Sequence, residues 1–146
     1  MTADIAACRK ALEHLDIDDN PKTVRQKSRD FYWYSPILKE QLDEVTADLV
    51  IAPRSVDEVI EILAACWKYD VPVTTRGAGT GNYGQAMPLF GGVVLHMRYM
   101  NEILEIGPDY FVAQGGTVIE EIETALRGQG NEIRLFPSTM SSATIG

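Results

Sequence analysis

The sequence predicts an α+β fold that begins with a parallel βαβ unit, and two observations support this prediction. An apolar strand over residues 49–53, a capped amphipathic helix and a second strand over residues 71–76 occur in succession within about 28 residues, a spacing typical of parallel strands joined by a right-handed crossover. Further along the chain, a hairpin pattern precedes a second amphipathic helix.

The first 47 residues are less regular and are expected to form an N-terminal helical and aromatic extension. Apolar residues at near-helical spacing predict a short helix within residues 3–15, and the polar, proline-containing residues 16–27 are expected to be a connecting segment. Next come four consecutive aromatic residues, Phe31 to Tyr34. A buried anchor or subunit contact is the favoured interpretation of this run, and a wall of a ligand pocket is the alternative.

The helix of the βαβ unit has a clear start signal. Ser55 and Glu58 form a capping box, in which each side chain accepts a hydrogen bond from the other end of the first turn. The apolar residues of this helix are expected to share one inward face, namely Val56, Val59, Ile60, Leu63, Ala64 and Trp67.

A single strand, a hairpin and a helix complete the predicted elements. A strand is expected at residues 92–97, and a hairpin pairs residues 103–106 with 110–114 around a turn at 107–109. Thr117 and Glu120 predict another capping box. The inward residues of that second helix are expected to be Val118, Ile119, Ile122, Ala125 and Leu126. The helix also carries Glu120, Glu121 and Glu123, which are expected to be solvated.

The most informative stretch is Arg76 to Gln85, which reads Arg-Gly-Ala-Gly-Thr-Gly-Asn-Tyr-Gly-Gln. Glycine permits positive φ angles and close approach of a ligand to the backbone. Successive exposed N–H groups in such a turn bind anions, so the stretch predicts a phosphate or pyrophosphate loop at the end of a strand. A plain connecting loop is the alternative.

The residues after the glycines exclude two common phosphate-binding loops. A Walker A loop needs a lysine on the phosphates, and no lysine occurs after Lys68. A Rossmann loop needs a helix directly after the glycines, whereas this chain continues into another strand at Val93. The glycine loop of this chain lies between two strands, so it is neither a Walker A loop nor a Rossmann loop.

Composition excludes several classes of function. The 146 residues are 45% hydrophobic and 23% charged, which is ordinary for a globular domain. The net charge of −8, without a basic cluster, argues against nucleic acid as a partner. No apolar run is long enough for a transmembrane helix, and no signal peptide is expected, so a cytoplasmic location is predicted.

The cysteines and histidines show no metal-ligand spacing, so no metal is expected. Cys8 and Cys66 are interpreted as reduced thiols, with Cys66 packed in a helix. A catalytic cysteine is the alternative, but no histidine pattern accompanies either thiol.

A series of short motifs runs in order from about Asp48 to the end of the chain. The motifs are Pro53-x-Ser-x-x-Glu-Val, Val73-Thr-Thr-Arg-Gly-Ala-Gly-Thr-Gly, Gly91-Gly-Val-Val-Leu, Met100-Asn-x-Ile-Leu-Glu, Gln114-Gly-Gly-Thr-Val-x-x-Glu, Pro137-Ser and Ala143-Thr-Ile-Gly. This ordered set resembles the FAD-binding domain of flavoproteins of the vanillyl-alcohol oxidase type, especially glycolate oxidase flavin subunits and D-lactate dehydrogenases. The resemblance divides the chain into residues 1–47 and an FAD-binding domain over 48–146. It implies a first subdomain and then the incomplete start of a second α+β subdomain.

The resemblance also implies a set of FAD-binding residues. Gly77, Ala78, Gly79, Thr80 and Gly81 would hold the pyrophosphate through backbone N–H groups, and Thr80 and Asn82 would add side-chain hydrogen bonds. The full implied set is Pro53, Arg76, Gly77, Ala78, Gly79, Thr80, Gly81, Asn82, Pro137, Ser138, Ser142, Thr144 and Gly146. Thr80 stands where some relatives carry a histidine joined covalently to the flavin, so noncovalent FAD is expected.

These observations support two hypotheses about function. In the first, the intact protein transfers a hydride equivalent from a small substrate, by resemblance a 2-hydroxy acid, to FAD, and this segment binds and orients the cofactor. No catalytic residue is assigned, and the chain alone is expected to be inactive and to self-associate through an exposed apolar face. In the second, the chain is a non-catalytic nucleotide- or phosphate-binding module.

Overall fold

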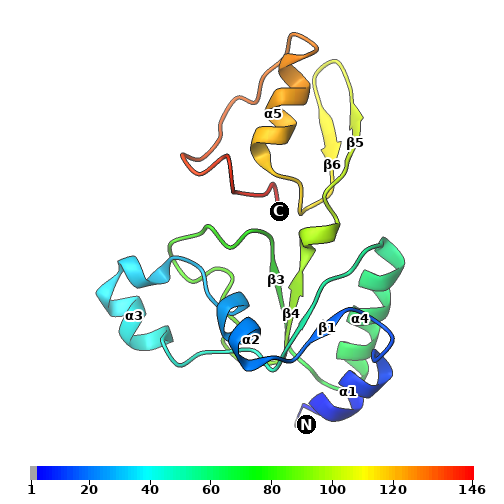
Figure 1. Cartoon of the computed structure of the whole chain (residues 1–146), viewed down its shortest axis with the longest axis vertical. Helices are drawn as coiled ribbons and strands as arrows, with labels where there is room; N and C mark the ends of the chain where they lie inside the picture. Colours follow the sequence, from blue (N-terminus) through cyan, green and yellow to red (C-terminus); the bar gives the residue numbers. More distant parts are fainter. Residues whose placement is uncertain (1–2) are drawn as a thin grey trace.

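A computed structural model describes residues 3–146 and divides into a larger and a smaller part (Figure 1). The larger part is a four-stranded sheet with helices, and the smaller part is a two-stranded hairpin with one helix. The fold is therefore mixed α+β with a mostly parallel main sheet, as predicted. Among residues 3–146, the structure contains no helix whose length and apolar content would let it cross a membrane.

The main sheet has the strand order β1-β2-β4-β3. Strands β2 (Leu49–Ile51) and β3 (Val73–Arg76) both run parallel to β4 (Val93–His96), while β1 (Ile17–Asp18) is an antiparallel edge strand on β2. The predicted parallel relation of β2 and β3 is confirmed, with β4 inserted between them. The carboxyl ends of the three parallel strands consequently meet at one edge of the sheet, where open α/β sheets bind ligands.

Helix α4 (Val56–Lys68) begins where the capping box places it. The Ser55 hydroxyl accepts from the Glu58 N–H at 3.2 Å, and the Glu58 carboxylate accepts from the Arg54 N–H at 2.8 Å. The predicted inward face is wrong, because Ile62 and Cys66 are the buried residues. The apolar residues of α4 are spread around most of its circumference. The periodicity therefore did not identify the face that packs on the sheet. Five of the six members of the predicted face are exposed, namely Val56, Ile60, Leu63, Ala64 and Trp67.

The N-terminal region contains more structure than its sequence predicts. Helix α1 (Ile5–Ala11) is confirmed, but residues 16–27 form β1 and helix α2 (Pro21–Lys27) instead of a plain connection. The Asn20 side chain caps α2 by accepting from the Lys22 N–H. A helix of two turns carries too few apolar positions for periodicity to reveal it. The short helices η1 (Tyr32–Tyr34) and α3 (Pro36–Leu42) complete the region.

The core of the larger part joins α1 and α4 to the sheet. Cys8 and Leu12 of this N-terminal region are fully buried with Ile62 and Cys66 of α4. The Cys8 and Cys66 sulfur atoms lie 3.9 Å apart and are not bonded as a disulfide. Burial raises the pKa of the Cys66 thiol to about 12, so this thiol is protonated and packs as a small apolar group.

The smaller part begins after η2 (Met97–Tyr99). Strands β5 (Ile103–Ile106) and β6 (Phe111–Ala113) form the predicted antiparallel hairpin, and helix α5 (Ile119–Arg127) buries Ile119, Ile122 and Leu126.

Two details of this part differ from the predictions. The capping box at Thr117 is wrong, because its hydroxyl donates to the carbonyl groups of Gln114 and Glu102, and α5 begins without a side-chain cap. Glu123 is buried rather than solvated, since its carboxylate accepts from the Ile133 N–H at 2.8 Å and from Arg127. These bonds, the one from Ile133 first, lower the pKa of Glu123 and keep the carboxylate charged.

The two parts meet at the end of the chain. Residues 143–146 run antiparallel to 115–119, where Ile145 donates to the Thr117 carbonyl and Gly146 to the Gly115 carbonyl. The C-terminus therefore lies between the parts, close to the segment after β3 (Figure 1).

Candidate functional site

The glycine loop, residues 77–84, starts at the carboxyl end of β3 and borders a cavity of about 530 Å³. This volume falls within the range of about 300–1,000 Å³ typical of small-molecule sites. The cavity lining combines backbone of the loop, apolar side chains of α4 and β4, and the end of the chain. The lining residues are Asp30, Val59, Leu63, Thr75, Arg76, Gly77, Ala78, Gly79, Thr80, Gly81, Gln85, Ala86, Leu95, Met97, Thr144 and Gly146.

The backbone of the loop presents unpaired hydrogen-bond donors. Within residues 3–146, the N–H groups of Gly77, Gly79, Thr80 and Gly81 donate to no other residue. Gly79 has a φ of 73°, a conformation that glycine adopts without strain. The Ala78 N–H differs, because it donates to the Thr144 hydroxyl at 3.0 Å. Four free donors along one short loop form a binding surface for an anion.

Arg76 places a positive charge at the base of this loop. The side chain is buried, and its two terminal nitrogens donate to the carbonyl groups of Arg29 and Ala78. Its Nε atom is buried and has no partner among the described residues. Burial lowers the pKa of Arg76, and the charge of Asp30 opposes that shift; arginine nevertheless stays protonated in proteins. The guanidinium therefore strengthens the preference of the loop for an anion.

Asp30 is the acidic residue of the cavity, and the sequence did not single it out. Its carboxylate is 3% exposed and accepts from the N–H groups of Tyr32 at 2.8 Å and Gly84 at 2.9 Å. Burial raises the pKa of Asp30, while the N–H groups of the segment from Gly84 to Ala86 and the charge of Arg76 oppose the rise. Because the bond to Gly84 spans 54 positions in the sequence, no local pattern predicts it.

His96, the register partner of Arg76, lies at the end of β4. Burial, with further contributions from the charges of Lys27, Arg76 and Arg98, lowers the pKa of His96 to about 4. The imidazole is therefore neutral near pH 7. It lines a separate cavity of about 40 Å³ and not the one at the glycine loop.

The structure brings together a large share of the predicted site residues. Arg76, the run from Gly77 to Gly81, Thr144 and Gly146 all line the cavity. Five predicted residues lie outside its lining: Pro53 is buried at the junction of β2 and α4, and the exposed ones are Asn82, Pro137, Ser138 and Ser142. Their contacts with a cofactor stay predictions.

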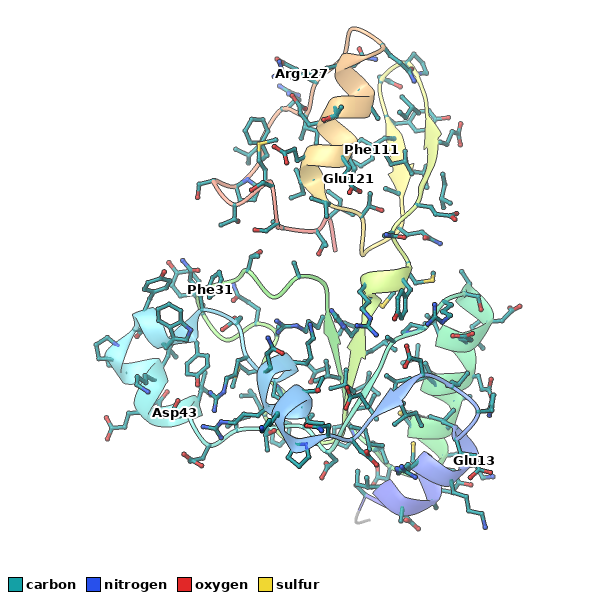
Figure 2. All side chains as sticks on the ribbon, viewed as in Figure 1. Glu13, Phe31, Asp43, Phe111, Glu121 and Arg127 are labelled. Atoms are coloured by element: carbon teal, nitrogen blue, oxygen red, sulfur yellow. The ribbon has the colours of Figure 1, made fainter. Side chains whose placement is uncertain are left out.

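The aromatic run Phe31 to Tyr34 also lies beside the loop but outside the cavity lining (Figure 2). The Phe31 N–H donates to the Gly81 carbonyl at 2.7 Å. Tyr32 is buried, whereas Trp33 and Tyr34 are exposed and pack against each other. Phe31 is exposed as well, so the run contains one buried residue and three exposed rings, and the interpretation as a buried anchor holds for Tyr32 alone.

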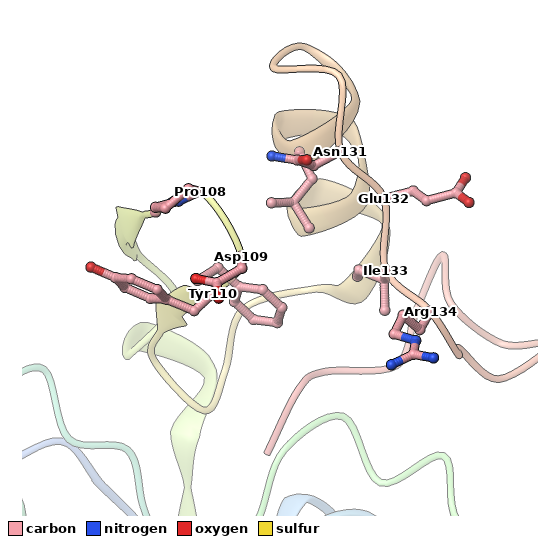
Figure 3. Close-up of a pocket in the computed structure, with 10 residues that line it drawn as sticks. Pro108, Asp109, Tyr110, Asn131, Glu132, Ile133 and Arg134 are labelled. Carbon is pink, nitrogen blue, oxygen red and sulfur yellow. The ribbon is translucent and has the colours of Figure 1, made fainter.

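A second cavity, of about 400 Å³, lies in the smaller part of the molecule. Figure 3 shows the hairpin turn from Pro108 to Tyr110 on one side of it and the segment from Asn131 to Arg134 on the other. Its charged residues, Asp109, Glu132 and Arg134, are all exposed. Charges surrounded by water bind ligands weakly, so the cavity at the glycine loop is the stronger candidate site.

The fold and the site together define a class of protein: an α+β domain in which a glycine loop between two parallel strands borders a cavity. Within that class, the chain belongs to the FAD-binding domain family, whose model matches residues 47–146.

The relatives in sequence include enzymes of known name. Over 101 residues, the chain is 40% identical to the glycolate oxidase subunit GlcD of Bacillus subtilis, covering 68% of this chain and 22% of that protein. It is 27% identical over 150 residues to the mitochondrial D-2-hydroxyglutarate dehydrogenase of Arabidopsis thaliana, covering 89% and 27%. A probable mitochondrial D-lactate dehydrogenase of Danio rerio is 32% identical over 85 residues, covering 57% and 17%. The chain thus spans less than a third of each relative and is related to FAD-dependent oxidoreductases.

Solved structures share the fold at low sequence identity. An alkyldihydroxyacetonephosphate synthase matches with a TM-score of 0.81 at 21% identity, covering 98% of this chain and 31% of that one. A p-cresol methylhydroxylase matches with a TM-score of 0.72 at 16% identity, covering 96% and 27%. These likenesses extend over nearly the whole chain, including most of its first 46 residues.

Proposed function

We propose that this chain is the FAD-binding part of an oxidoreductase that takes a hydride equivalent from a small 2-hydroxy acid. The names of the relatives support the substrate class, because glycolate, D-lactate and D-2-hydroxyglutarate each carry a hydroxyl group beside a carboxylate. The cofactor supplies the redox chemistry when bound, and the protein supplies binding and orientation.

The observation that carries this proposal is the set of free donors on the glycine loop. Gly77, Gly79, Thr80 and Gly81, whose N–H groups have no partner among the described residues, line a cavity together with the buried Arg76. Several N–H donors with one cation suit a pyrophosphate, which carries two negative charges and many acceptor oxygens. The apolar side chains of Val59, Leu63, Leu95 and Met97 would contact the less polar parts of FAD.

The lining of the cavity also supports noncovalent FAD. Among the described residues that line it, there is no histidine, cysteine or tyrosine. A covalent link to flavin needs a nucleophilic side chain of this kind near the ring. Thr80 of the loop lines the cavity, and its hydroxyl would act toward a cofactor as a hydrogen-bond donor and acceptor.

The residues of this chain do not account for substrate oxidation. Asp30 is the carboxylate of the cavity, and hydrogen bonds from backbone N–H groups occupy it. The chain spans less than a third of the length of these relatives. We therefore assign catalysis to the intact protein and no activity to residues 1–146 alone. The two free, buried thiols suit a reducing compartment such as the cytoplasm.

A titration tests the proposal. FAD is added to the purified chain and its fluorescence quenching is measured, with ADP and inorganic pyrophosphate as competitors. We expect FAD to bind and both competitors to displace it, since they share the phosphate contacts. Binding of ADP and pyrophosphate with no measurable FAD binding would instead favour the non-catalytic nucleotide-binding module.

A further inference from the structure

Three consecutive residues of the N-terminal region hold the glycine loop at three points. The Arg29 carbonyl accepts from the Arg76 guanidinium. The Asp30 carboxylate accepts from the Gly84 N–H at 2.9 Å, and the Phe31 N–H donates to the Gly81 carbonyl at 2.7 Å. These contacts reach Arg76 at the base of the loop, Gly81 in its middle and Gly84 at its end. They come from outside residues 47–146, the part that matches the family.

The loop has little internal support of its own. Gly79 and Gly84 both have positive φ, at 73° and 80°. Among residues 77–84, the N–H groups that donate are Ala78 to Thr144, Tyr83 to the Gln85 side chain and Gly84 to Asp30. None of these is a backbone hydrogen bond within the loop. Glycine-rich backbone without internal hydrogen bonds is mobile unless neighbouring groups fix it.

The side chain of Asp30 is suited to hold the glycine loop in one conformation. One carboxylate oxygen accepts from the Tyr32 N–H and the other from the Gly84 N–H, so the same side chain joins its own segment to the loop. The carboxylate is 3% exposed, and removal of a charge from water is unfavourable unless strong hydrogen bonds compensate. Hydrogen bonds from N–H groups to a carboxylate are of the stronger kind. The charged form of Asp30 is therefore compatible with burial only while the loop keeps this conformation.

We propose that Asp30 is a positioning residue of the cofactor site. It holds the glycine loop so that the N–H groups of Gly77, Gly79, Thr80 and Gly81 stay directed at one anion. The inference rests on the proposed function for the identity of the ligand, and on the hydrogen bonds of Asp30 for the role. It makes residues 29–31 part of the site, although the match to the family begins at residue 47.

A second aspartate in the chain provides a matched control. The Asp48 carboxylate accepts from the Gly92 N–H at 2.7 Å and so holds a turn whose glycines, Gly91 and Gly92, also have positive φ. That turn lies at the amino ends of β2 and β4, the opposite ends from the glycine loop. Asp48→Ala therefore removes the same kind of bond without touching the site.

The test compares Asp30→Ala, Asp30→Asn and Asp48→Ala with the unaltered chain. Dissociation constants are measured for FAD and for inorganic pyrophosphate, and stability is measured by urea unfolding. We expect Asp30→Ala to weaken both ligands by about 10- to 100-fold, the usual effect of losing a hydrogen bond to a charged group. Asp30→Asn keeps one acceptor oxygen and should recover part of the affinity. Asp48→Ala should lower stability and leave both affinities within about 3-fold of the original.

Each outcome decides a separate question. Unchanged affinities in Asp30→Ala, or an equal loss in Asp48→Ala, would overturn the positioning role while leaving FAD binding intact. If the unaltered chain binds pyrophosphate but not FAD, the proposed function fails, and the pyrophosphate titration still decides the role of Asp30. Should Asp30→Ala not fold, the comparison of Asp30→Asn with the unaltered chain decides, with normal affinity counting against the role. An unaltered chain that binds neither ligand would overturn both proposals.

Discussion

Replacement of Gly79 by alanine should damage the site through Arg76. A Cβ atom at Gly79 would lie 2.1 Å from the terminal nitrogen of the Arg76 side chain, far inside contact distance. The residue also has a φ of 73°, which costs a non-glycine residue about 1–2 kcal/mol. Displacement of the guanidinium would break its bonds to Arg29 and Ala78, and a hydrogen bond to a charged group contributes about 1.5–3 kcal/mol. These terms together predict that Gly79→Ala costs about 4–8 kcal/mol of stability, and we expect it to weaken FAD binding.

Gly130→Ala is the matched control for this prediction. Gly130 has a φ of 80°, yet a Cβ atom there would meet nothing within 4 Å. The control should cost only the conformational term of about 1–2 kcal/mol and leave FAD binding unchanged. Urea unfolding and FAD titration of both variants give the comparison. Equal losses of stability, or normal FAD affinity in Gly79→Ala, would refute the argument that the loop and Arg76 act together.

Three further predictions test other parts of the structure. First, the folded state lowers the pKa of His96 from 6.5 to about 4, so the unfolded chain binds a proton first as the pH falls. Stability should therefore drop by about 2 kcal/mol between pH 7 and pH 5, and urea unfolding of His96→Gln should show a smaller drop. Second, acid precipitation of the FAD complex should release all the flavin into the supernatant, and yellow colour in the pellet would contradict noncovalent binding. Third, three exposed residues of α4 that do not line the cavity, Val56, Ile60 and Trp67, lie at positions i, i+4 and i+11, a spacing that suits pairing with α4 of a second copy. An antiparallel pair would bring the acidic first turn of one helix near Lys68 of the other. Light scattering should show concentration-dependent dimers that Ile60→Glu abolishes, while Leu104→Glu, at a residue of similar exposure, should leave them intact.

Local patterns in the sequence predicted the elements with strong local causes. The Ser55 capping box fixed the start of α4, and the glycine run after β3 identified the loop that borders the cavity. The capping box at Thr117 failed because two carbonyl groups compete for the same hydroxyl, and one of them belongs to Glu102, fifteen positions away. A local motif contains no information about such a competitor.

The parts of the site that the sequence did not reveal depend on contacts between distant residues. Asp30 directly precedes the conspicuous aromatic run, whereas its own partner, Gly84, lies 54 positions further on. The face of α4 was also undetermined, because apolar residues occur on several sides and only packing against the sheet selects Ile62 and Cys66. Leu63 illustrates the consequence, since it was expected in the core and instead lines the cavity while remaining 45% exposed.

The net charge of −8 does not conflict with an anion site, because the two act over different distances. Exposed carboxylates are screened beyond a Debye length of about 8–10 Å in physiological salt. The donors of the glycine loop and the Arg76 guanidinium line the cavity itself, where the effective dielectric constant is lower and direct contact with a ligand excludes salt. Local geometry therefore decides binding there, while the overall charge disfavours long polyanions that must lie across the acidic surface. Such an arrangement would favour a compact anion, such as the pyrophosphate group of the proposed FAD, over a long polyanion.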